Sequence, residues 1–323
     1  MPLPLSDCPD AAAIRAAWER TPSLPGHPRV RVFEVSGREY VGLTHRLGGE
    51  DLFELERETT FRLAQDPSVA LGPLWDSSDL MVLPKVEPLA VPGLASGDVA
   101  DDEYAAHVAT LMVGVHRQPP PLHSMRSEQV LRLPIPIDRW ANTPERVVEL
   151  VVQLREHQGC VDEITRLRLE VARVQPQVTV HGDLKPDNIM IGPGATAVGI
   201  DWETSGSGPA VEDFAAFWAG LFVEMLAQSV AQGAGEDDLR EVAVGTERRL
   251  ERMLQAVVSE YVRRMSVHFT PADLHALGLL RLMARLESMC RTRSARSVDE
   301  LFLLRAVTHG LGSWKSGVSG GAT

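Results

Sequence analysis

The feature that most constrains the fold of this chain is the segment VTVHGDLKPDNIMIGPGATAVGIDWE, residues 178–203. An apolar strand pattern leads into a polar stretch, and a second apolar run follows it. GPGATA predicts a turn, after which VGI runs back to Asp201. A loop followed by a hairpin brings Asp183, Asn188 and Asp201 together, although the first and last are 18 positions apart (201 − 183 = 18).

These three side chains form a set with a defined chemical use. Transfer of a phosphoryl group needs metal ions that hold the phosphates, and a carboxylate that orients the attacking hydroxyl and accepts its proton. Mg²⁺ prefers hard oxygen ligands and takes only a few of them from the protein. One Asp as the base, an amide oxygen five residues later and a second Asp at a strand end supply that set.

Composition limits the other possibilities. The 323 residues are enough for two lobes, and the net charge of -12 argues against a nucleic-acid surface. The start of the chain carries no basic segment followed by an apolar run, so we expect a cytoplasmic protein without a membrane partner. Cys8, Cys160 and Cys290 lack the spacing of a zinc site or a disulfide framework. Oligomeric state is not readable from the sequence.

The first 85 residues predict a small strand-rich unit. Residues 29–47 alternate as two strands joined at Ser36-Gly37, which indicates a β-hairpin. A helix is predicted over 50–65, with Leu52, Leu55, Thr59 and Leu63 on one stripe, and LMVLP at 80–84 is typical of a short buried strand.

Beyond residue 85 the pattern changes. Residues 85–103 are rich in Pro, Gly and acidic side chains, which suits a connector between lobes. Helical periodicity follows at 102–116 and 143–157, and again in apolar stripes within 214–225, 250–261 and 274–286. The sequence therefore predicts an α+β chain with an N-terminal unit at 1–85 and a mainly helical unit at 86–323.

A family resemblance follows from these motifs. HGDLKPDN resembles the HxDxxxxN catalytic loop of the protein-kinase-like superfamily, and the version with Gly182 and IDWE is similar to the aminoglycoside phosphotransferase family. LMVLPKVEPLAVPG is similar to the interlobe hinge of that family, and AAHVATLMVGVHRQ resembles the helix that follows it. SGPAVEDFAAFWAGL resembles the segment whose Asp, here Asp213, braces the catalytic loop. The likeness covers about residues 30–221.

The resemblance implies a bilobal protein-kinase-like fold that uses ATP and Mg²⁺. It implies Asp183 as the catalytic base, with His181 as a structural support of its loop. Asn188 and Asp201 are implied as magnesium ligands. The adenine is expected against the hinge residues, which are Val82, Leu83 and Lys85.

Two residues near the loop have open roles. Lys185 is one of only three lysines in the chain, and we expect it to stabilise the transferred phosphate, as in Ser/Thr protein kinases; the alternative is a solvated loop lysine. Glu203, two residues after Asp201, is a candidate to assist the metal or the substrate.

The nucleotide-binding pattern of the family is incomplete here. The third strand normally carries a lysine that pairs with a helix glutamate, but REYVGLTHRL contains none. Glu58 fits the glutamate by its place in the helix, and Arg46 is the favoured basic substitute, with His45 and Thr44 as alternatives. Lys85 paired with Glu103 is less favoured, since Lys85 falls in the hinge pattern. The glycine-rich loop is reduced to Gly26 in PSLPGHPRVRV.

The expected function is ATP- and Mg-dependent phosphoryl transfer to a hydroxyl of a small molecule, aminoglycoside-like or another natural product. The acidic run GEDD at 235–238 would suit a cationic substrate, although such runs are commonly solvated helix starts. A peptide or protein Ser/Thr hydroxyl is the alternative, because of Lys185. A pseudokinase that acts as a binding scaffold is the second alternative, because of the missing lysine.

Overall fold

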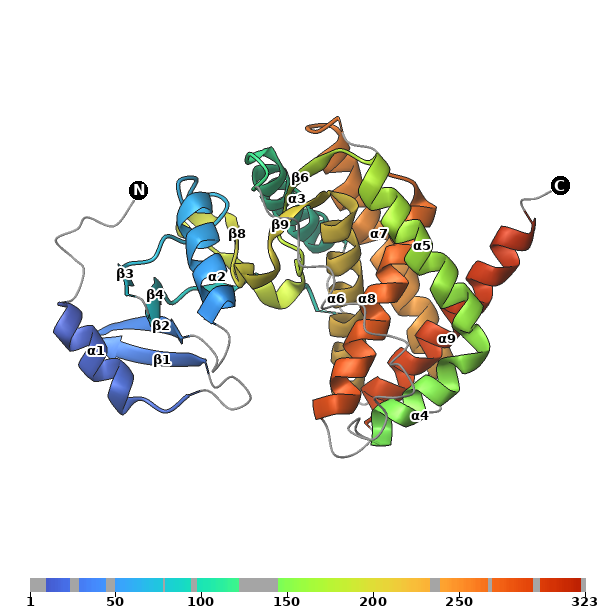
Figure 1. Cartoon of the computed structure of the whole chain (residues 1–323), viewed down its shortest axis with the longest axis horizontal. Helices are drawn as coiled ribbons and strands as arrows, with labels where there is room; N and C mark the ends of the chain where they lie inside the picture. Colours follow the sequence, from blue (N-terminus) through green and yellow to red (C-terminus); the bar gives the residue numbers. More distant parts are fainter. Residues whose placement is uncertain are drawn as a thin grey trace.

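The computed structural model describes residues 10–23, 29–44, 50–77, 79–93, 98–121, 145–232, 239–266, 269–292 and 297–320. It has two parts that lie side by side (Figure 1). The smaller part contains the sheet and two helices, and the larger part is mainly helical.

The smaller part is built on a four-stranded antiparallel sheet in the order β1-β2-β4-β3. Its strands are β1 (Val30–Val35), β2 (Arg38–Thr44), β3 (Trp75–Asp76) and β4 (Leu80–Pro84). Ser36 and Gly37 join β1 to β2 with positive φ angles of 53° and 77°, the conformation that a two-residue hairpin turn requires. The predicted hairpin and the buried strand at 80–84 are confirmed.

Helix α1 (Ala11–Arg20) covers this sheet and was not foreseen from the sequence. Its buried face presents Ile14, Ala17 and Trp18 to Phe33 and the other apolar side chains of the sheet. Gly42 leaves room for the indole, because a Cβ on that residue would lie 2.5 Å from the Trp18 ring. A small apolar core therefore holds the N-terminal helix on β1 and β2.

The larger part consists of helices and two small sheets. Its helices are α3 (Asp98–Arg117), α4 (Glu145–Leu154), α5 (Gln158–Val174), α6 (Val211–Ala231), α7 (Leu239–Val262), α8 (Pro271–Thr292) and α9 (Val298–Gly320). One sheet has the order β5-β7-β8, with strands Glu87–Pro88, Ile189–Ile191 and Ala197–Gly199. The other pairs β6 (Gln177–Val180) with β9 (Gly206–Pro209). Short 3-10 turns, η4 (Arg155–His157), η5 (Pro186–Asn188), η6 (Pro193–Ala195) and η7 (Trp202–Thr204), link these elements.

Helix α6 is the centre of the helical core. It contacts α7, α8 and α9, and its length and apolar composition would also allow it to cross a membrane. In this structure its side chains Phe214, Phe217, Leu221 and Met225 are fully buried in the protein core. At its first turn, Glu212 forms buried ion pairs with Arg168 of α5 and Arg281 of α8, at 2.5 and 2.8 Å, so three helices are tied together there.

A separate apolar cluster joins the two parts. It packs Phe53 of α2 (Glu50–Leu63), with Met81 and Leu83 of β4, against Val198 of β8. Met190 and Ile200, which are partly buried, lie against the same cluster. The chain thus places the 178–203 segment directly beside the small sheet.

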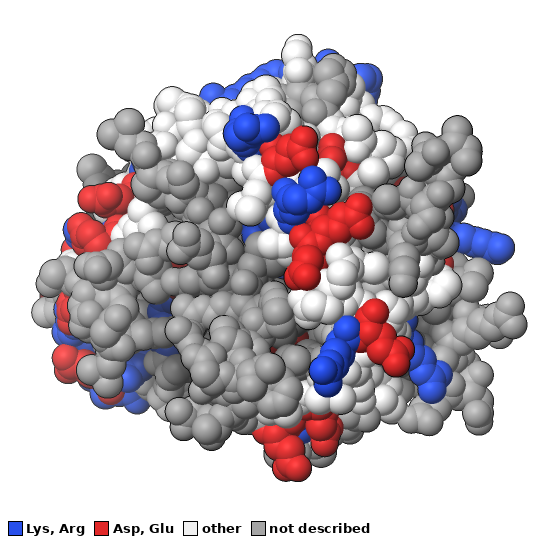
Figure 2. Space-filling model, turned by 45° about the vertical axis from the view of Figure 1, so that its right-hand side comes forward, with Lys and Arg blue, Asp and Glu red and all other residues white. Residues whose placement is uncertain are grey.

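These features confirm the predicted α+β class, with a small antiparallel N-terminal part and a larger helical C-terminal part. The division of the chain at residue 85 stays a prediction. On the face shown in Figure 2, Lys and Arg side chains of the described residues lie next to Asp and Glu side chains, in mixed groups.

Candidate active site

The predicted catalytic loop follows β6 and begins at the fully buried His181. The ring Nε2 of His181 lies 2.7 Å from the Ile200 carbonyl oxygen, and its Nδ1 accepts a hydrogen bond from the Asp183 backbone N–H at 3.4 Å. Because a carbonyl can only accept, Nε2 carries a proton in this arrangement. His181 therefore fixes the backbone of Asp183 to the strand that precedes Asp201.

Asp213, at the start of α6, holds the same loop from below. Its carboxylate accepts hydrogen bonds from the backbone N–H groups of His181 and Gly182, at 2.9 and 2.8 Å. His116 of α3 adds a third contact at 3.0 Å, and its other ring nitrogen lies 2.8 Å from the Tyr261 hydroxyl of α7. Burial alone would raise the pKa of Asp213, but these hydrogen bonds outweigh it and lower the pKa.

Two glycines let the loop fit closely against its surroundings. Gly182 has a φ of 84°, and a Cβ there would lie 2.6 Å from the Thr204 carbonyl oxygen. Gly220 of α6 lies beneath the loop, where a Cβ would lie 2.6 Å from the Lys185 Cβ and 2.8 Å from the Pro186 Cδ. The loop backbone therefore rests directly on the central helix.

Asp183, Lys185 and Asn188 have distinct surroundings. The Lys185 ammonium lies 2.6 Å from a carboxylate oxygen of Asp183, and both side chains are partly exposed. Asn188 is buried, and its amide nitrogen donates to the Asp183 carbonyl oxygen at 2.8 Å. Its amide oxygen thus remains as an acceptor, the kind of atom that Mg²⁺ binds.

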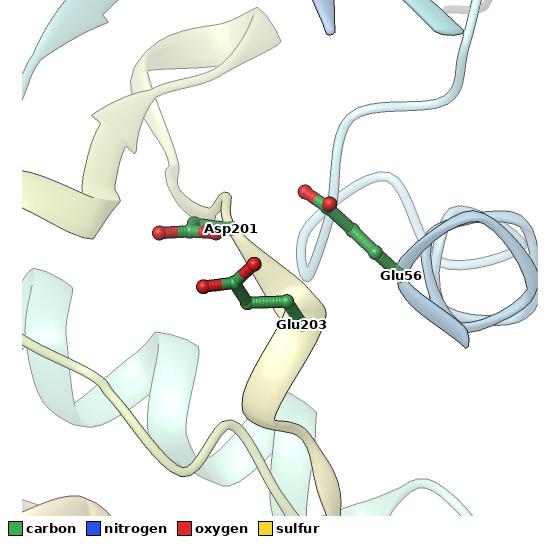
Figure 3. Close-up of side chains that lie close together, drawn as sticks. All are labelled: Glu56, Asp201 and Glu203. Carbon is green, nitrogen blue, oxygen red and sulfur yellow. The ribbon is translucent and has the colours of Figure 1, made fainter. Parts of the chain in front are cut away.

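Asp201 ends the hairpin in the left-handed conformation, with a φ of 63°. Figure 3 shows Asp201 and Glu203 next to each other, with the carboxylate of Glu56 extending from α2 toward them. Oxygen atoms of the three groups lie within 4.8 Å of one another. Burial and the charge of Glu203 raise the pKa of Asp201. Burial and the charge of Asp201 raise the pKa of Glu56 to about 7.

This set of carboxylates fits a divalent cation. Carboxylate oxygens are the hard ligands that Mg²⁺ prefers, and burial together with the repulsion between neighbouring carboxylates raises the pKa values of Glu56 and Asp201. A bound cation would supply the missing positive charge.

Arg29, next to β1, is a protein cation that pairs with two carboxylates of this cluster. Its guanidinium forms ion pairs with Glu56 and with Glu203, both at 2.6 Å. It thereby links a helix of the small part to the turn that follows Asp201. The sequence interpretation did not include Arg29 among the site residues.

The helix glutamate at the site is Glu56 and not the predicted Glu58. Glu58 is exposed, whereas Glu56 is 2% exposed and faces Asp201. The buried face of α2 runs through Phe53, Glu56, Thr60 and Leu63, which repeats at three and four residues. A carboxylate on an otherwise apolar stripe was the signal that could have identified Glu56.

The other predicted nucleotide-binding residues lie in several places. Val82 and Leu83 are buried in β4, and the Lys85 ammonium pairs with Glu39 at 2.8 Å on the surface. The Thr44 hydroxyl donates to the Asp79 carbonyl oxygen at 2.7 Å. Gly26, His45 and Arg46 lie outside the described residues, as does the acidic run at 235–238.

Comparison with known proteins identifies the family. Residues 29–249, more than half of the chain, match the phosphotransferase enzyme family. The chain belongs to that family. The prediction of an enzyme, and of a phosphotransferase in particular, is therefore confirmed, as is the resemblance drawn from HGDLKPDN. None of the curated proteins matches the sequence.

Solved structures of other phosphotransferases share the fold of this one. Choline kinase LicA from Streptococcus pneumoniae has a TM-score of 0.56 at 14% identity, covering 91% of this chain and 92% of that one. Amicoumacin kinase hAmiN, in complex with AMP-PNP, Ca²⁺ and Ami, has a TM-score of 0.55 at 13% identity, with 96% and 95% covered. Spectinomycin phosphotransferase APH(9)-Ia, bound to AMP, has a TM-score of 0.54 at 10% identity, with 88% and 90% covered.

Proposed function

We propose that this phosphotransferase transfers the γ-phosphate of ATP, with Mg²⁺, to a hydroxyl group of a small molecule. The observation that carries the proposal is that the catalytic loop and the cluster of three carboxylates lie next to each other. The Asp183 loop, held by Asp213, lies close enough to Asp201 for the charges of Asp183 and Lys185 to act on it, and Asp201 is grouped with Glu56 and Glu203. A base and an oxygen-rich cation site side by side are what in-line phosphoryl transfer requires.

Each residue has a role that its surroundings support. Asp183 accepts the proton of the attacking hydroxyl, and its position is fixed through the backbone by His181 and Asp213. Lys185 lies at hydrogen-bond distance from Asp183, where its charge can stabilise the transferred phosphate. Asn188, Asp201 and Glu203 would hold Mg²⁺, which neutralises phosphate charge when it is bound.

The nucleotide base has a suitable apolar surface. Met190 and Ile200 of the larger part, Leu43 of the smaller part and Val86, which follows β4, are partly buried against one cluster. Flat aromatic bases bind well between such side chains. We therefore propose that the adenine lies here, next to β4, in agreement with the hinge predicted from Val82 and Leu83.

The acceptor is proposed to be a small molecule because several related structures carry such substrates in their names. The structures named above are of choline, amicoumacin and spectinomycin kinases. A Ser/Thr peptide remains the alternative favoured by Lys185. The proposal also places the enzyme in the cytoplasm.

Calorimetry of ATP binding, with and without Mg²⁺, tests the nucleotide part of this proposal. The unmodified protein should bind ATP more tightly with Mg²⁺, and Asp201→Ala should lose the magnesium dependence. Asp183→Asn should keep ATP binding while its turnover falls by about 10²- to 10⁴-fold. Failure of the unmodified protein to bind ATP, even with candidate acceptors present, would contradict the proposal and favour a binding scaffold.

A second experiment separates the acceptor classes. ADP release is measured with aminoglycosides, choline and amicoumacin-like amines, and with serine-containing peptides, using Asp183→Asn as the inactive control. Turnover with a small alcohol supports the proposal. Turnover with peptides alone would replace it by the peptide-kinase alternative.

A further inference from the structure

Arg29, which precedes β1, lies opposite Thr44, one of the positions considered for the lysine that this chain lacks. β1 and β2 pair antiparallel, with Val30 opposite Leu43. Arg29 is therefore opposite Thr44, and the Thr44 backbone N–H donates to the Arg29 carbonyl oxygen at 3.1 Å. Thr44 itself carries no charge and its hydroxyl is directed to Asp79. A cation reaches the same end of the sheet from the neighbouring strand instead.

The Arg29 side chain is held on three sides. Its Nε donates to the Thr44 carbonyl oxygen at 2.9 Å, its Nη1 to Glu203 at 2.6 Å and its Nη2 to Glu56 at 2.6 Å. A guanidinium has five N–H groups, so these contacts use three of them. Two N–H groups, one on each Nη, remain without a partner among the described residues.

Of the two carboxylates that pair with Arg29, one can be replaced by another anion. Glu56 is 2% exposed, whereas Glu203 is 26% exposed. A buried ion pair is costly to break, while a partly exposed one is weak. The pair with Glu56 therefore keeps the guanidinium in place, and the pair with Glu203 is the one that an incoming anion can replace.

We propose that Arg29 binds the phosphates of the nucleotide, and so fulfils from β1 the role for which the sequence of β2 provides no lysine. The proposal rests on the function proposed above. The planar guanidinium and its two unused N–H groups match two phosphate oxygens. Glu56 orients Arg29 from α2, and Glu203 is released toward Asp201 when phosphate takes its place.

Ligands with different numbers of phosphates test this role. Affinities for adenosine, AMP, ADP and ATP are measured by calorimetry for the unmodified protein and for Arg29→Met. A phosphate-binding arginine predicts a loss of about 10- to 100-fold for ADP and ATP, as expected for a hydrogen bond between charged groups, and less than about twofold for adenosine. Arg29→Lys, which keeps the charge but not the fork, should lie between the two proteins.

Arg57→Gln is the matched control. Arg57 is on the same helix as Glu56 and also bridges two carboxylates, Glu54 and Asp76, at 2.6 and 2.8 Å. It has no ion pair with Glu56 or Glu203, so its removal should leave all four affinities unchanged within about twofold. A loss of ADP affinity in Arg57→Gln as large as in Arg29→Met would overturn the proposal.

A variant that folds is needed for a clear answer, because Arg29→Met leaves the buried Glu56 without its partner. The double variant Arg29→Met/Glu56→Gln removes that charge, and it is compared with Glu56→Gln alone. Equal loss of affinity for adenosine and ADP would mean that Arg29 only ties the two parts of the protein together. If the unmodified protein bound none of the four ligands, both this proposal and the proposed function would fail.

Discussion

The buried carboxylate of Asp213 and the three carboxylates of Glu56, Asp201 and Glu203 both lie next to the catalytic loop, and their charges are compensated very differently. Asp213 has three hydrogen-bond donors around one carboxylate, and its pKa is lowered. By contrast, Glu56 and Glu203 pair with the guanidinium of Arg29 and Asp201 is near the charge of Lys185, yet the pKa values of Glu56 and Asp201 are raised.

The difference shows which site is complete without a ligand. Asp213 has three protein partners for its carboxylate, so its charge stabilises the fold without a ligand. The second cluster has more negative charge than the protein compensates, which destabilises the free protein. Such imbalance is common where a cation or substrate completes the site. The two groups thus serve structure and binding respectively.

The largest expected effect is that of Asp213→Asn. The amide cannot accept both backbone hydrogen bonds as a carboxylate does, and it removes the charge that His116 faces. We expect a loss of about 3 kcal/mol in the free energy of unfolding, as for other buried ion pairs that lose one partner. Urea denaturation measures this value. A loss below about 1 kcal/mol would contradict the conclusion that the charge of Asp213 stabilises the fold.

The pH dependence of stability should show that the charge of Glu56, unlike that of Asp213, destabilises the folded protein. Its pKa is about 7 in the folded protein against an ordinary value of 4.5, so between these values the folded state holds a proton that the unfolded chain has lost. Stability in metal-free buffer should therefore fall as the pH rises from 5 to 8, by at most about 3 kcal/mol. Urea denaturation at both pH values measures the change.

Glu56→Gln is the control for this titration. Its amide oxygen can still accept the Arg29 hydrogen bond but does not ionise, so the stability should change less between pH 5 and 8. An equally steep decrease in the unmodified protein and the variant would contradict the assignment to Glu56.

Asp201→Asn should stabilise the free protein, in contrast to Asp213→Asn. The substitution removes a charge whose pKa is raised by burial and Glu203, and Asn tolerates the positive φ of this position. We expect a gain of about 1 kcal/mol at pH 8, together with the loss of any stabilisation by Mg²⁺. Thermal unfolding with EDTA and with MgCl₂ measures both effects. If Asp201→Asn were less stable than the unmodified protein without metal, Asp201 would stabilise the fold as Asp213 does, and the proposed difference between them would be wrong.

The smallest effect is expected for Glu58→Gln. Glu58 is exposed on α2, and surface substitutions of this kind change stability by less than about 0.5 kcal/mol. Nucleotide affinity should also be unchanged, whereas Glu56→Gln should alter it. Calorimetry on the two variants side by side would show whether the correction from Glu58 to Glu56 holds.

The sequence predicted the parts of the fold that depend on local pattern. The β1–β2 hairpin followed from its alternation and from Ser36-Gly37, and the apolar stripes of α6, α7 and α8 predicted buried helices. Helices α1, α5 and α9 were missed. The buried stripe of α1, with Ile14 and Trp18, is interrupted by charged residues and offered too few apolar positions to stand out.

The sequence predicted the residues of the catalytic loop but not the charged residues Glu56 and Arg29 that lie near it. HGDLKPDN carries Asp183 and Asn188 in consecutive sequence, so one segment was sufficient. Glu56 and Arg29 come from other elements, and only the packing of α2 and the register of the hairpin bring them together. That register was nevertheless readable, because a turn at Ser36-Gly37 pairs Val35 with Arg38, and counting outward from the turn puts Arg29 opposite Thr44.

Gly220 has a consequence for any selection experiment on this protein. It lies on α6 with the Lys185 and Pro186 side chains against the place where its own side chain would be. Even alanine there would force the loop backbone away from α6. In a library screened for activity, Gly220 should therefore tolerate as few substitutions as a residue of the reaction centre, although it would never touch a reactant. Mutational tolerance alone would then overstate the extent of the catalytic surface.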